Sequence, residues 1–393
     1  MRRTLIITAI VLILIGIGIF VYFYFFANKA GVTVTPGNLP VAGQGTGTGA
    51  GSVATTTNRA TLVSARLVQI SKGPVVPGEV VVNIPAQNAS SSPEISVTYI
   101  ERQSGNVFTY QERAGTLTRT NNKTIPGIQS AVWLPDASLA FVRYLSGDDF
   151  STINTYALPS SGSGGFFLQQ NISDLSVSSS SILTLASGVN GSVASLGRSD
   201  GTQLLEVFTT PLSAVHTSFA GNTNYLAYTK PSATLEGDAF LVTKGHLSRV
   251  AGPLNGLVAL SSPSGKWLLV SYTQDTTIQM ELVDTTTGDI IQLPVSTIAD
   301  KCVWTADDSS IYCGIPVSPP SSYAYPDDWY QGAVHFSDRI WKIDVTDRQA
   351  QLVLDFPKET NTSLDAIALA IDPLATTLVF MNKNDGSLWS YSL

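Results

Sequence analysis

A unit of about 43 residues recurs along the chain, and this repeat constrains the fold more than any other feature. In each copy a strand-like apolar run ends in a short turn of Pro, Ser, Asp, Gly or Asn, and a second apolar run follows at once. The clearest copies are 133–141, 262–270, 304–312 and 371–380. The turns lie at successive spacings of 42, 43, 42, 43, 43 and 67 residues, at Pro93, Pro135, Ser178, Ala220, Pro263, Ala306 and Pro373. Seven such turns predict seven structural units.

Within each unit, apolar and polar residues alternate with a period of two, and β-branched and aromatic residues are enriched. We expect no helix after residue 26. Third strands are predicted at 106–111, 277–283 and 387–393, and fourth strands at 290–293 and 351–354. Four antiparallel strands in each of about seven repeats are typical of an all-β β-propeller. Because three of the turns are weak, six or eight blades stay open as alternatives to seven.

The two ends of the repeat region complement each other. The seventh unit stops after its third strand at Leu393, whereas residues 61–71 supply a spare strand ahead of the first unit. An open sheet edge invites unwanted pairing, so such edges are normally covered. We therefore expect the segment Thr61–Ile70 to complete the last blade and to close the ring.

The turn element resembles a known repeat. A Pro-Asp or Pro-Ser-Gly turn between two apolar runs, with Trp or Ser just before it, is similar to the WD40-like repeat of the TolB-type propellers and of the propeller domain of dipeptidyl peptidase IV. The resemblance covers 61–393, and the chain as a whole is most similar to bacterial membrane-anchored propellers. The motif is short, so it implies the fold rather than an activity.

The chain also departs from these families. TolB-type propellers have six blades and carry an N-terminal domain that has no counterpart here. The α/β-hydrolase domain that carries catalysis in the peptidase would have to follow Leu393, so that activity is not expected.

Residues 4–26 form an apolar stretch of 23 residues without a charge. A helix rising about 1.5 Å per residue would span roughly 35 Å over this length, which is enough to cross a bilayer. Arg2 and Arg3 precede the stretch and only Lys29 follows it closely, so the positive-inside rule predicts a cytoplasmic N-terminus. We expect a single-pass anchor in the cytoplasmic membrane with the propeller outside the cytoplasm. A removed signal peptide is the alternative.

The predicted organisation has three parts. Residues 1–27 form a cytoplasmic stub and a transmembrane anchor, 28–60 a flexible Gly- and Thr-rich linker, and 61–393 the propeller. The glycines of 43–51 do not indicate a phosphate loop, because no strand precedes them and no helix or lysine follows.

Composition excludes several classes of function. The chain is 44% hydrophobic and only 13% charged, with a net charge of −7. It therefore lacks the broad basic field that nucleic acid phosphates require, and no nucleic-acid partner is expected. Two cysteines exclude a disulfide-dense scaffold and a four-cysteine zinc site. We expect no cofactor and no metal.

Cys302 and Cys313 flank the sixth turn and would lie opposite each other in its hairpin. Cross-strand neighbours on one face are within reach of a bond, and a location outside the cytoplasm permits oxidation. We predict a disulfide, with two buried reduced thiols as the alternative.

The interval of 67 residues before the last turn contains an insertion, 316–337, between the second and third strands of the sixth unit. Exposed aromatic residues beside carboxylates suit a peptide or sugar ligand, because rings supply contact area and acids supply direction. The predicted binding residues are Tyr325, Asp327, Asp328, Trp329, Tyr330 and His335. One alternative is a loop folded over the propeller face with Trp329 plugging the channel. A weaker alternative is a metal site formed by Asp327, Asp328, His335 and Asp338.

Other connections between second and third strands share this face and are acidic. They carry Asp148, Asp149, Glu236, Asp238, Asp275 and Asp385. Such a face would favour a cationic partner, although acidic loops also serve solubility alone.

Catalytic motifs are lacking in the sequence. The three histidines are His216, His246 and His335, and neither a Gly-x-Ser-x-Gly elbow nor a His-Glu-x-x-His helix is present. We interpret His216 and His246 as satisfied surface residues. Adjacent carboxylates such as Asp307 and Asp308 point in opposite directions in an extended segment, which is wrong for joint acid and base work. No catalytic residue is expected.

Together these features predict a membrane-anchored, extracytoplasmic β-propeller that acts as a protein-binding or scaffolding module. Its partner would be an envelope or extracellular protein or peptide. The alternative is an envelope polysaccharide hydrolase or lyase with its active site in the propeller channel. A structural spacer is the third interpretation.

Overall fold

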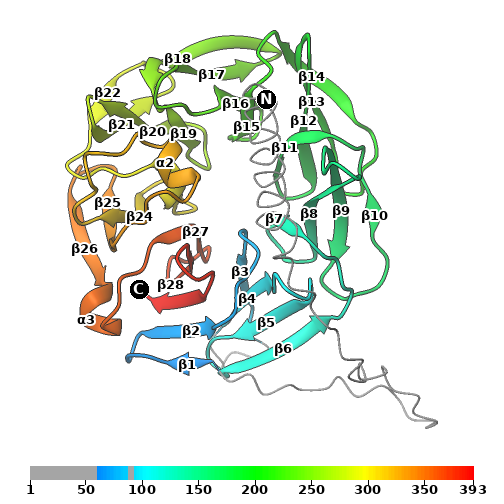
Figure 1. Ribbon diagram of the computed structural model, residues 1–393, viewed down its shortest axis with the longest axis vertical. Helices are drawn as coiled ribbons and strands as arrows, with labels where there is room; N and C mark the ends of the chain where they lie inside the picture. The colour runs from blue at the N-terminus through cyan, green and yellow to red at the C-terminus, as the bar shows by residue number, and fades with distance from the viewer. Residues whose placement is uncertain (1–59, 87–92) are drawn as a thin grey trace, which may run out of the picture. The chain divides into compact units, whose positions relative to one another are not determined.

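In the computed structural model of this chain, residues 60–86 and 93–393 are described, and they form seven antiparallel β-sheets (Figure 1). Figure 1 shows the sheets following one another around a ring, with the first strand of most sheets toward the centre. The prediction of an all-β propeller with seven blades is confirmed. The predicted anchor at 4–26 and most of the predicted linker lie outside the described residues. Within the described part, no helix is both long enough and apolar enough to cross a membrane.

Each of the first six blades takes four consecutive strands. Blade 1 contains β3 (Val80–Ile84), β4 (Glu94–Ile100), β5 (Val107–Gln111) and β6 (Thr116–Asn121). Blade 2 contains β7 (Ile128–Trp133), β8 (Leu139–Ser146), β9 (Thr152–Pro159) and β10 (Phe166–Phe167). Blade 3 contains β11 (Ile172–Val177), β12 (Ser181–Gly188), β13 (Gly191–Arg198) and β14 (Leu205–Thr210). Blade 4 contains β15 (Val215–Ala220), β16 (Asn224–Thr229), β17 (Glu236–Thr243) and β18 (His246–Asn255). Blade 5 contains β19 (Val258–Ser261), β20 (Trp267–Gln274), β21 (Thr277–Asp284) and β22 (Ile290–Gln292). Blade 6 contains β23 (Cys302–Trp304), β24 (Ser310–Pro316), β25 (Asp338–Asp344) and β26 (Ala350–Asp355).

Blade 7 joins the two ends of the ring. It contains β27 (Ala366–Ile371), β28 (Thr377–Asn382), β29 (Leu388–Ser392), β2 (Leu67–Ser71) and β1 (Thr61–Leu62). β2 pairs antiparallel with β29, so the predicted closure by the early segment is confirmed. The expectation of one continuous strand over Thr61–Ile70 is wrong, because a turn interrupts it. The backbone N–H groups of Val63 and Ser64 both donate to the carbonyl of Leu67, which folds β1 back as a fifth strand.

All seven repeat turns connect the first and second strands of a blade. In the clear copies the third turn residue has a positive φ, as at Ala137 (59°), Gly265 (77°), Asp308 (61°) and Ala375 (52°). At position 265 the turn also packs closely on blade 4, where a Cβ would lie 2.6 Å from the carbonyl carbon of Ala220. Glycine is therefore required there by space as well as by conformation.

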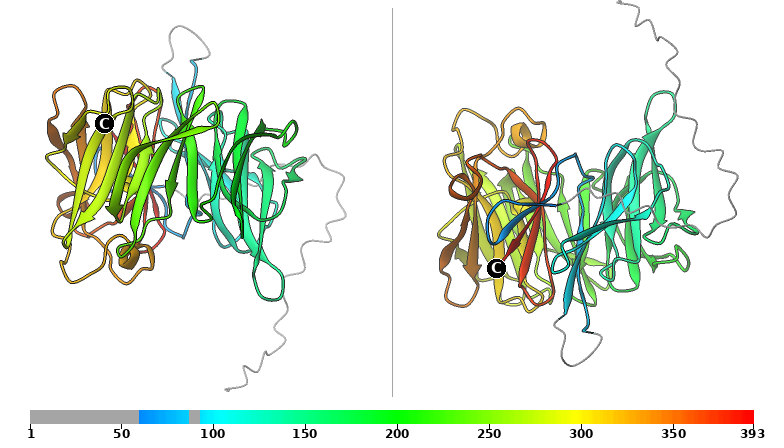
Figure 2. Two further views of the ribbon diagram at one scale, coloured as in Figure 1. Left: turned by 90° about the horizontal axis from the view of Figure 1, so that it is seen from above. Right: turned by 90° about the horizontal axis from the view of Figure 1, so that it is seen from below.

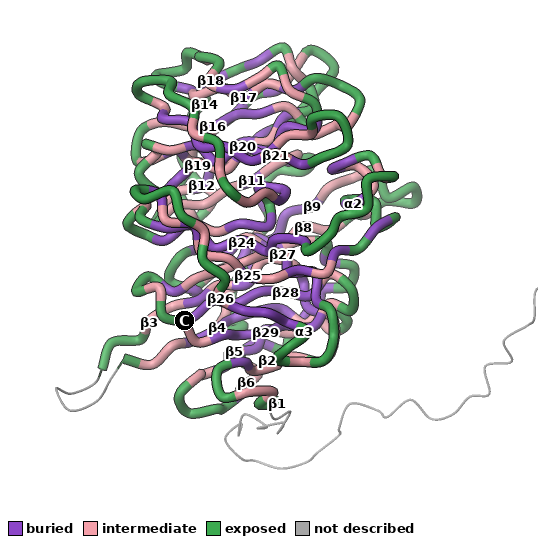
Figure 3. Tube along the Cα trace, turned by 90° about the vertical axis from the view of Figure 1, so that its left-hand side faces the viewer, coloured by how far each residue is buried: buried purple, intermediate pink, exposed green. Residues whose placement is uncertain are grey.

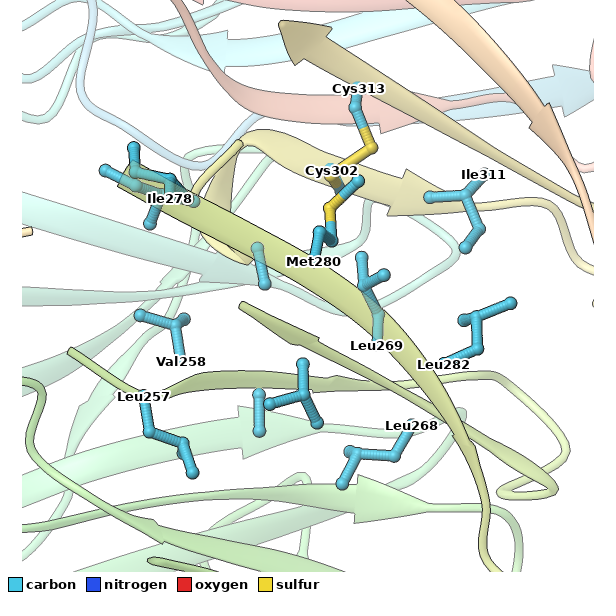
Figure 4. Packing of buried hydrophobic residues seen from close by; sticks show 14 of the residues in the cluster. Leu257, Val258, Leu268, Leu269, Ile278, Met280, Leu282, Cys302, Ile311 and Cys313 are labelled. Atoms are coloured by element: carbon cyan, nitrogen blue, oxygen red, sulfur yellow. A yellow bond between two sulfur atoms is a disulfide. The ribbon is translucent and has the colours of Figure 1, made fainter. Parts of the chain in front are cut away.

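Buried side chains fill the spaces between neighbouring blades. Figure 3 shows the strands as largely buried and the connecting loops as largely exposed. The largest cluster spans blades 4 to 6 and includes Leu269, Met280 and Leu282, which Figure 4 shows between the strands. Views from the side show the loops gathered on two opposite faces of the ring (Figure 2).

Within residues 60–86 and 93–393, three short helical segments lie between strands. They are η2 (Ala299–Lys301), α2 (Asp327–Tyr330) and α3 (Phe356–Thr360). The expectation of no helix after residue 26 is therefore wrong in detail. Helical segments this short contain too few residues to show the periodic apolar pattern from which helices are predicted, and they make few hydrogen bonds of their own.

Candidate functional site

The insertion of blade 6 lies on the face formed by the connections between second and third strands, which we call the loop face. It runs from the end of β24 to the start of β25 and contains α2. The linkers between blades reach the same face, because antiparallel strands alternate in direction. Residues from several blades can therefore meet at the insertion.

Two of the predicted binding residues are buried within the insertion. Trp329 is only 3% exposed and Tyr325 only 1%. The Trp329 Nε1–H donates to Asp365 Oδ2 at 3.0 Å, and the Tyr325 hydroxyl donates to the carbonyl of Pro320 at 2.7 Å. The expectation of exposed aromatic rings is wrong for these two residues, since both hold the insertion against the propeller.

The other predicted residues keep more contact with solvent. Tyr330 is 42% exposed and His335 is exposed, while Asp327 and Asp328 are half-buried. The Asp328 carboxylate accepts the backbone N–H of Ala324 at 2.7 Å, which fixes the start of α2. The Tyr330 hydroxyl donates to Asp300 Oδ2 at 2.5 Å.

A cavity of about 520 Å³ opens beside α2, and we call it the loop-face cavity. It is lined by His216, Lys230, Pro231, Ser232, Asp300, Asp327, Tyr330 and Gln331. Its walls come from blade 4, from the linker between blades 5 and 6, and from the insertion. Asp327 and Tyr330 are thus brought to one cavity, whereas Tyr325, Asp328, Trp329 and His335 do not line it.

His216 forms one wall of this cavity and pairs with a carboxylate of the neighbouring blade. It lies on β15, and its Nδ1 is 3.3 Å from Asp174 Oδ2 on β11. Asp174 is held in place by the backbone N–H of Thr217, which donates to the same oxygen at 2.8 Å. The imidazole also stacks on Tyr228, with ring centroids 5.2 Å apart. Burial lowers the pKa of His216, but the hydrogen bond and charge of Asp174, together with the charge of Asp300, outweigh it and raise the pKa overall.

Asp300 and Tyr330 form a second pair in the same cavity. Close packing of protein around Asp300 raises the pKa of its carboxyl group, although the Tyr330 hydrogen bond and the charge of His216 act in the opposite direction. Close packing of protein around the Tyr330 hydroxyl and the nearby Asp300 charge raise the pKa of Tyr330 well above its usual range. Tyr330 therefore keeps its proton and donates a hydrogen bond to Asp300 across the physiological pH range.

The cavity carries charges of both signs. The exposed side chain of Lys230 and the imidazole of His216 face the carboxyl groups of Asp300 and Asp327. Elsewhere on the loop face, one carboxylate of the predicted acidic loops forms an ion pair with a neighbouring strand. Asp238 Oδ1 lies 3.4 Å from Arg249 Nη1.

Sequence analysis missed most of the cavity. The sequence predicts His216 to be a satisfied surface residue, and no motif marks Asp174, Lys230 or Asp300. One signal was available, because Asp174 and His216 are 42 residues apart, which is one repeat. Equivalent positions on the innermost strands of successive blades are neighbours in a propeller.

No metal centre forms at the insertion. Over the described ranges, no three His, Cys, Asp or Glu side chains gather in a way that could hold an ion. The alternative metal site therefore lacks its geometry: Asp338 is fully buried, whereas His335 is exposed.

Cys302 and Cys313 lie opposite each other on β23 and β24 and are joined by a disulfide in this structure. Their Cα atoms are 4.1 Å apart. The bond lies directly after η2, next to the linker that carries Asp300.

No protein-family model matches the sequence, and the search of curated proteins finds no match. Solved structures do match, and the chain is a seven-bladed β-propeller by fold. An oligogalacturonate lyase from Vibrio parahaemolyticus is 6% identical with a TM-score of 0.55, over 83% of this chain and 93% of that one.

Two further neighbours have the same fold. An oligogalacturonate lyase in complex with manganese is 9% identical with a TM-score of 0.51, over 82% of this chain and 98% of that one. The β-propeller domain of the Trilobed protease from Pyrococcus furiosus is 7% identical with a TM-score of 0.50, over 79% and 93%. At these identities the similarity concerns the fold alone, and these neighbours do not single out the TolB-type or dipeptidyl peptidase IV propellers.

Proposed function

We propose that this propeller is a recognition module that binds a peptide segment of an envelope or extracellular protein in the loop-face cavity. Residues 4–26 would hold it at the cytoplasmic membrane with the propeller outside the cytoplasm. The observation that carries the proposal is the construction of the cavity, whose walls come from blade 4, from the linker between blades 5 and 6, and from the long insertion of blade 6.

The chemistry of the lining favours a peptide. Lys230 and His216 can donate hydrogen bonds to carbonyl groups, and the carboxylates of Asp300 and Asp327 can accept them from N–H groups. A peptide backbone offers both kinds of group at every residue. A sugar would gain from flat aromatic surfaces, but Trp329 and Tyr325 are buried, which leaves Tyr330 as the exposed ring in the lining.

Affinity capture tests this function directly. The full chain in detergent is immobilised and exposed to solubilised envelope proteins, beside a variant with Asp300→Asn and Tyr330→Phe. His335→Ala is the matched control, because His335 belongs to the same insertion but does not line the cavity. A partner retained by the wild type and the control, and lost by the double variant, supports the proposal. Equal capture by all three contradicts the role of the cavity, and capture by none contradicts recognition.

Hydrolysis or cleavage of envelope polysaccharide is the second candidate function. It is favoured by His216 and Asp300 in one cavity, since an imidazolium that can give a proton and a carboxylate that can accept one are the minimum for such chemistry. Two structural neighbours are named as oligogalacturonate lyases. Release of shorter sugars from envelope polysaccharide by the wild type, and its loss in His216→Gln, would establish this alternative over recognition.

A further inference from the structure

Lys301 is completely buried at the end of η2 and lies against two buried carboxylates. Its Nζ donates to Asp338 Oδ2 at 2.7 Å and to the carbonyl of Ala366 at 3.0 Å, and it contacts Asp365 Oδ1. The side chains of all three ionisable residues are 0% exposed. Two buried carboxylates around one ammonium leave a negative charge without a counter-charge in direct contact, since Lys383, which interacts by charge with Asp365, contacts the ring and carbonyl of Trp329 rather than a carboxylate. Such an arrangement is costly for a purely structural ion pair.

The second oxygen of Asp365 is held by two N–H donors. The indole Nε1–H of Trp329 and the backbone N–H of Phe336 both donate to Oδ2 at 3.0 Å. Two fixed donors aimed at one carboxyl oxygen are the arrangement that stabilises the anion of a tetrahedral intermediate. The ring centroids of Trp329 and Phe336 also lie 5.0 and 5.3 Å from Lys301 Nζ. These rings help to keep water away from Lys301 and Asp365.

Asp338 is suited to move protons beside this pair. Its Oδ2 accepts from Lys301 and from the backbone N–H of Ala366 at 2.7 Å. Its Oδ1 is buried and has no hydrogen-bond partner within the described residues. Burial, opposed by Lys301 and reinforced by the charge of Asp365, raises the pKa of Asp338 to about 6. This carboxyl group can therefore hold and release a proton near neutral pH.

We propose that Lys301 and Asp365 form an intramolecular isopeptide bond, with Asp338 as the catalytic proton-transfer group. The ammonium of Lys301 first gives one proton to the Asp365 carboxylate, which leaves a neutral amine beside a carboxylic acid. The amine lone pair attacks Asp365 Cγ, and the developing negative charge rests on Oδ2 between the two N–H donors. Protonated Asp338 gives its proton to the departing Oδ1 hydroxyl, which leaves as water, and Asp338 then takes the surplus proton from the nitrogen. The products are one amide and one water, and Asp338 is regenerated.

The bond would join two linkers across a blade boundary. Lys301 ends the linker between blades 5 and 6, and Asp365 directly precedes β27 of blade 7. The two residues are 64 positions apart, so the bond would enclose all of blade 6 with its insertion. Blade 7 is the blade that closes the ring through β2, and the bond would make its junction with blade 6 covalent.

The mass of the full wild-type chain, purified in detergent, tests the proposal. We expect a mass lower by one water than the sequence requires, after correction for the disulfide. Trypsin should then fail to cut after Lys301 and should yield a branched species in which 267–339 is joined to 359–383. A chain of full mass that releases separate peptides ending at Lys301 and Lys383 would overturn the proposal. Loss of water located in any other peptide would overturn it as well.

Three variants separate the chemistry from folding. Lys301→Arg should keep the full mass, whereas Asp365→Asn should form the same amide by releasing ammonia in place of water. Asp338→Asn should retain most chains unlinked, while near-ultraviolet circular dichroism and an intact disulfide show that they are folded. Linkage of the Asp338→Asn chain to the wild-type extent would overturn the role of Asp338. The wild-type mass decides the bond itself even if a variant does not fold.

Discussion

The imidazole Nδ1 of His216 lies 3.3 Å from Asp174 Oδ2, although the two residues belong to neighbouring blades. The contact connects the innermost strands β15 and β11 at the loop face and orients the imidazole in the cavity wall. Protonation of His216 should therefore affect both the stability of the ring and the charge of the proposed binding site.

The His216 contact should make stability depend on pH. The folded-state pKa of His216 is raised above its value in the unfolded chain. The favourable contribution is therefore fully present below the unfolded pKa, about 6.5, and is lost as pH rises through the higher folded pKa. We expect His216→Gln to lower the melting temperature at pH 6 by more than at pH 8.5. An equal loss at both pH values would show that the contact with Asp174 is not ionic.

Glu79 should also make stability fall as pH rises, because its buried carboxyl group must ionise. Both of its carboxyl oxygens are buried without a hydrogen-bond partner among the described residues, and burial raises its pKa to about 8. The folded state prefers protonated Glu79, so stability is lost as pH rises from about 4.5 through 8. Glu79→Gln should raise the free energy of unfolding at pH 9 by on the order of 3 kcal/mol and change it little at pH 4.5. Urea unfolding at the two pH values measures this, and a variant less stable than wild type at pH 9 would contradict it.

The closing strand should be essential to the whole propeller. Leu67 on β2 is 0% exposed, and Leu67→Ala should cost about 2–5 kcal/mol. Leu62 on β1 is the matched control, because it is 67% exposed and its replacement by Ala should change stability by less than about 0.5 kcal/mol. Chemical unfolding of both variants compares them. Similar small losses for both would mean that the early segment does not contribute to closure.

The disulfide should contribute stability by restricting the unfolded chain. Cys302 and Cys313 enclose a short loop, for which a stabilisation of roughly 2–3 kcal/mol is expected. A reductant should lower the melting temperature of the wild type and leave that of the variant with both Cys302→Ser and Cys313→Ser unchanged. Two free thiols on the unfolded, unreduced protein would reject the bond.

The repeat predicted the architecture because the first turn of every blade is a local signal. Polar turn residues at a fixed spacing gave the blade count, and the unmatched segment before Pro93 gave the closure. The turn that separates β1 from β2 was missed, because Val63–Arg66 lacks Gly and Pro. The long interval before Pro373 located the insertion correctly between β24 and β25.

The side-chain arrangement of the site depends on residues far apart in the sequence, so less of it could be predicted from the sequence. Trp329 looks like an exposed ligand contact in sequence, but it is buried because Asp365, 36 residues later, accepts its indole N–H. Lys383 Nζ also lies over the Trp329 ring, 4.1 Å from its centroid. Neither partner is marked by a motif. The pairing of Asp174 with His216 was accessible in principle, because one repeat separates them.

The affinity of the captured partner for paired histidine variants tests the central claim most directly. His216 lines the loop-face cavity, whereas His246 is exposed at the start of β18 and does not line it. We predict that His216→Gln weakens equilibrium binding of the partner to the full chain at least about tenfold, the loss of one hydrogen bond to a charged group, and that His246→Gln leaves binding unchanged. Equal affinities of the two variants and the wild type would contradict recognition through this cavity.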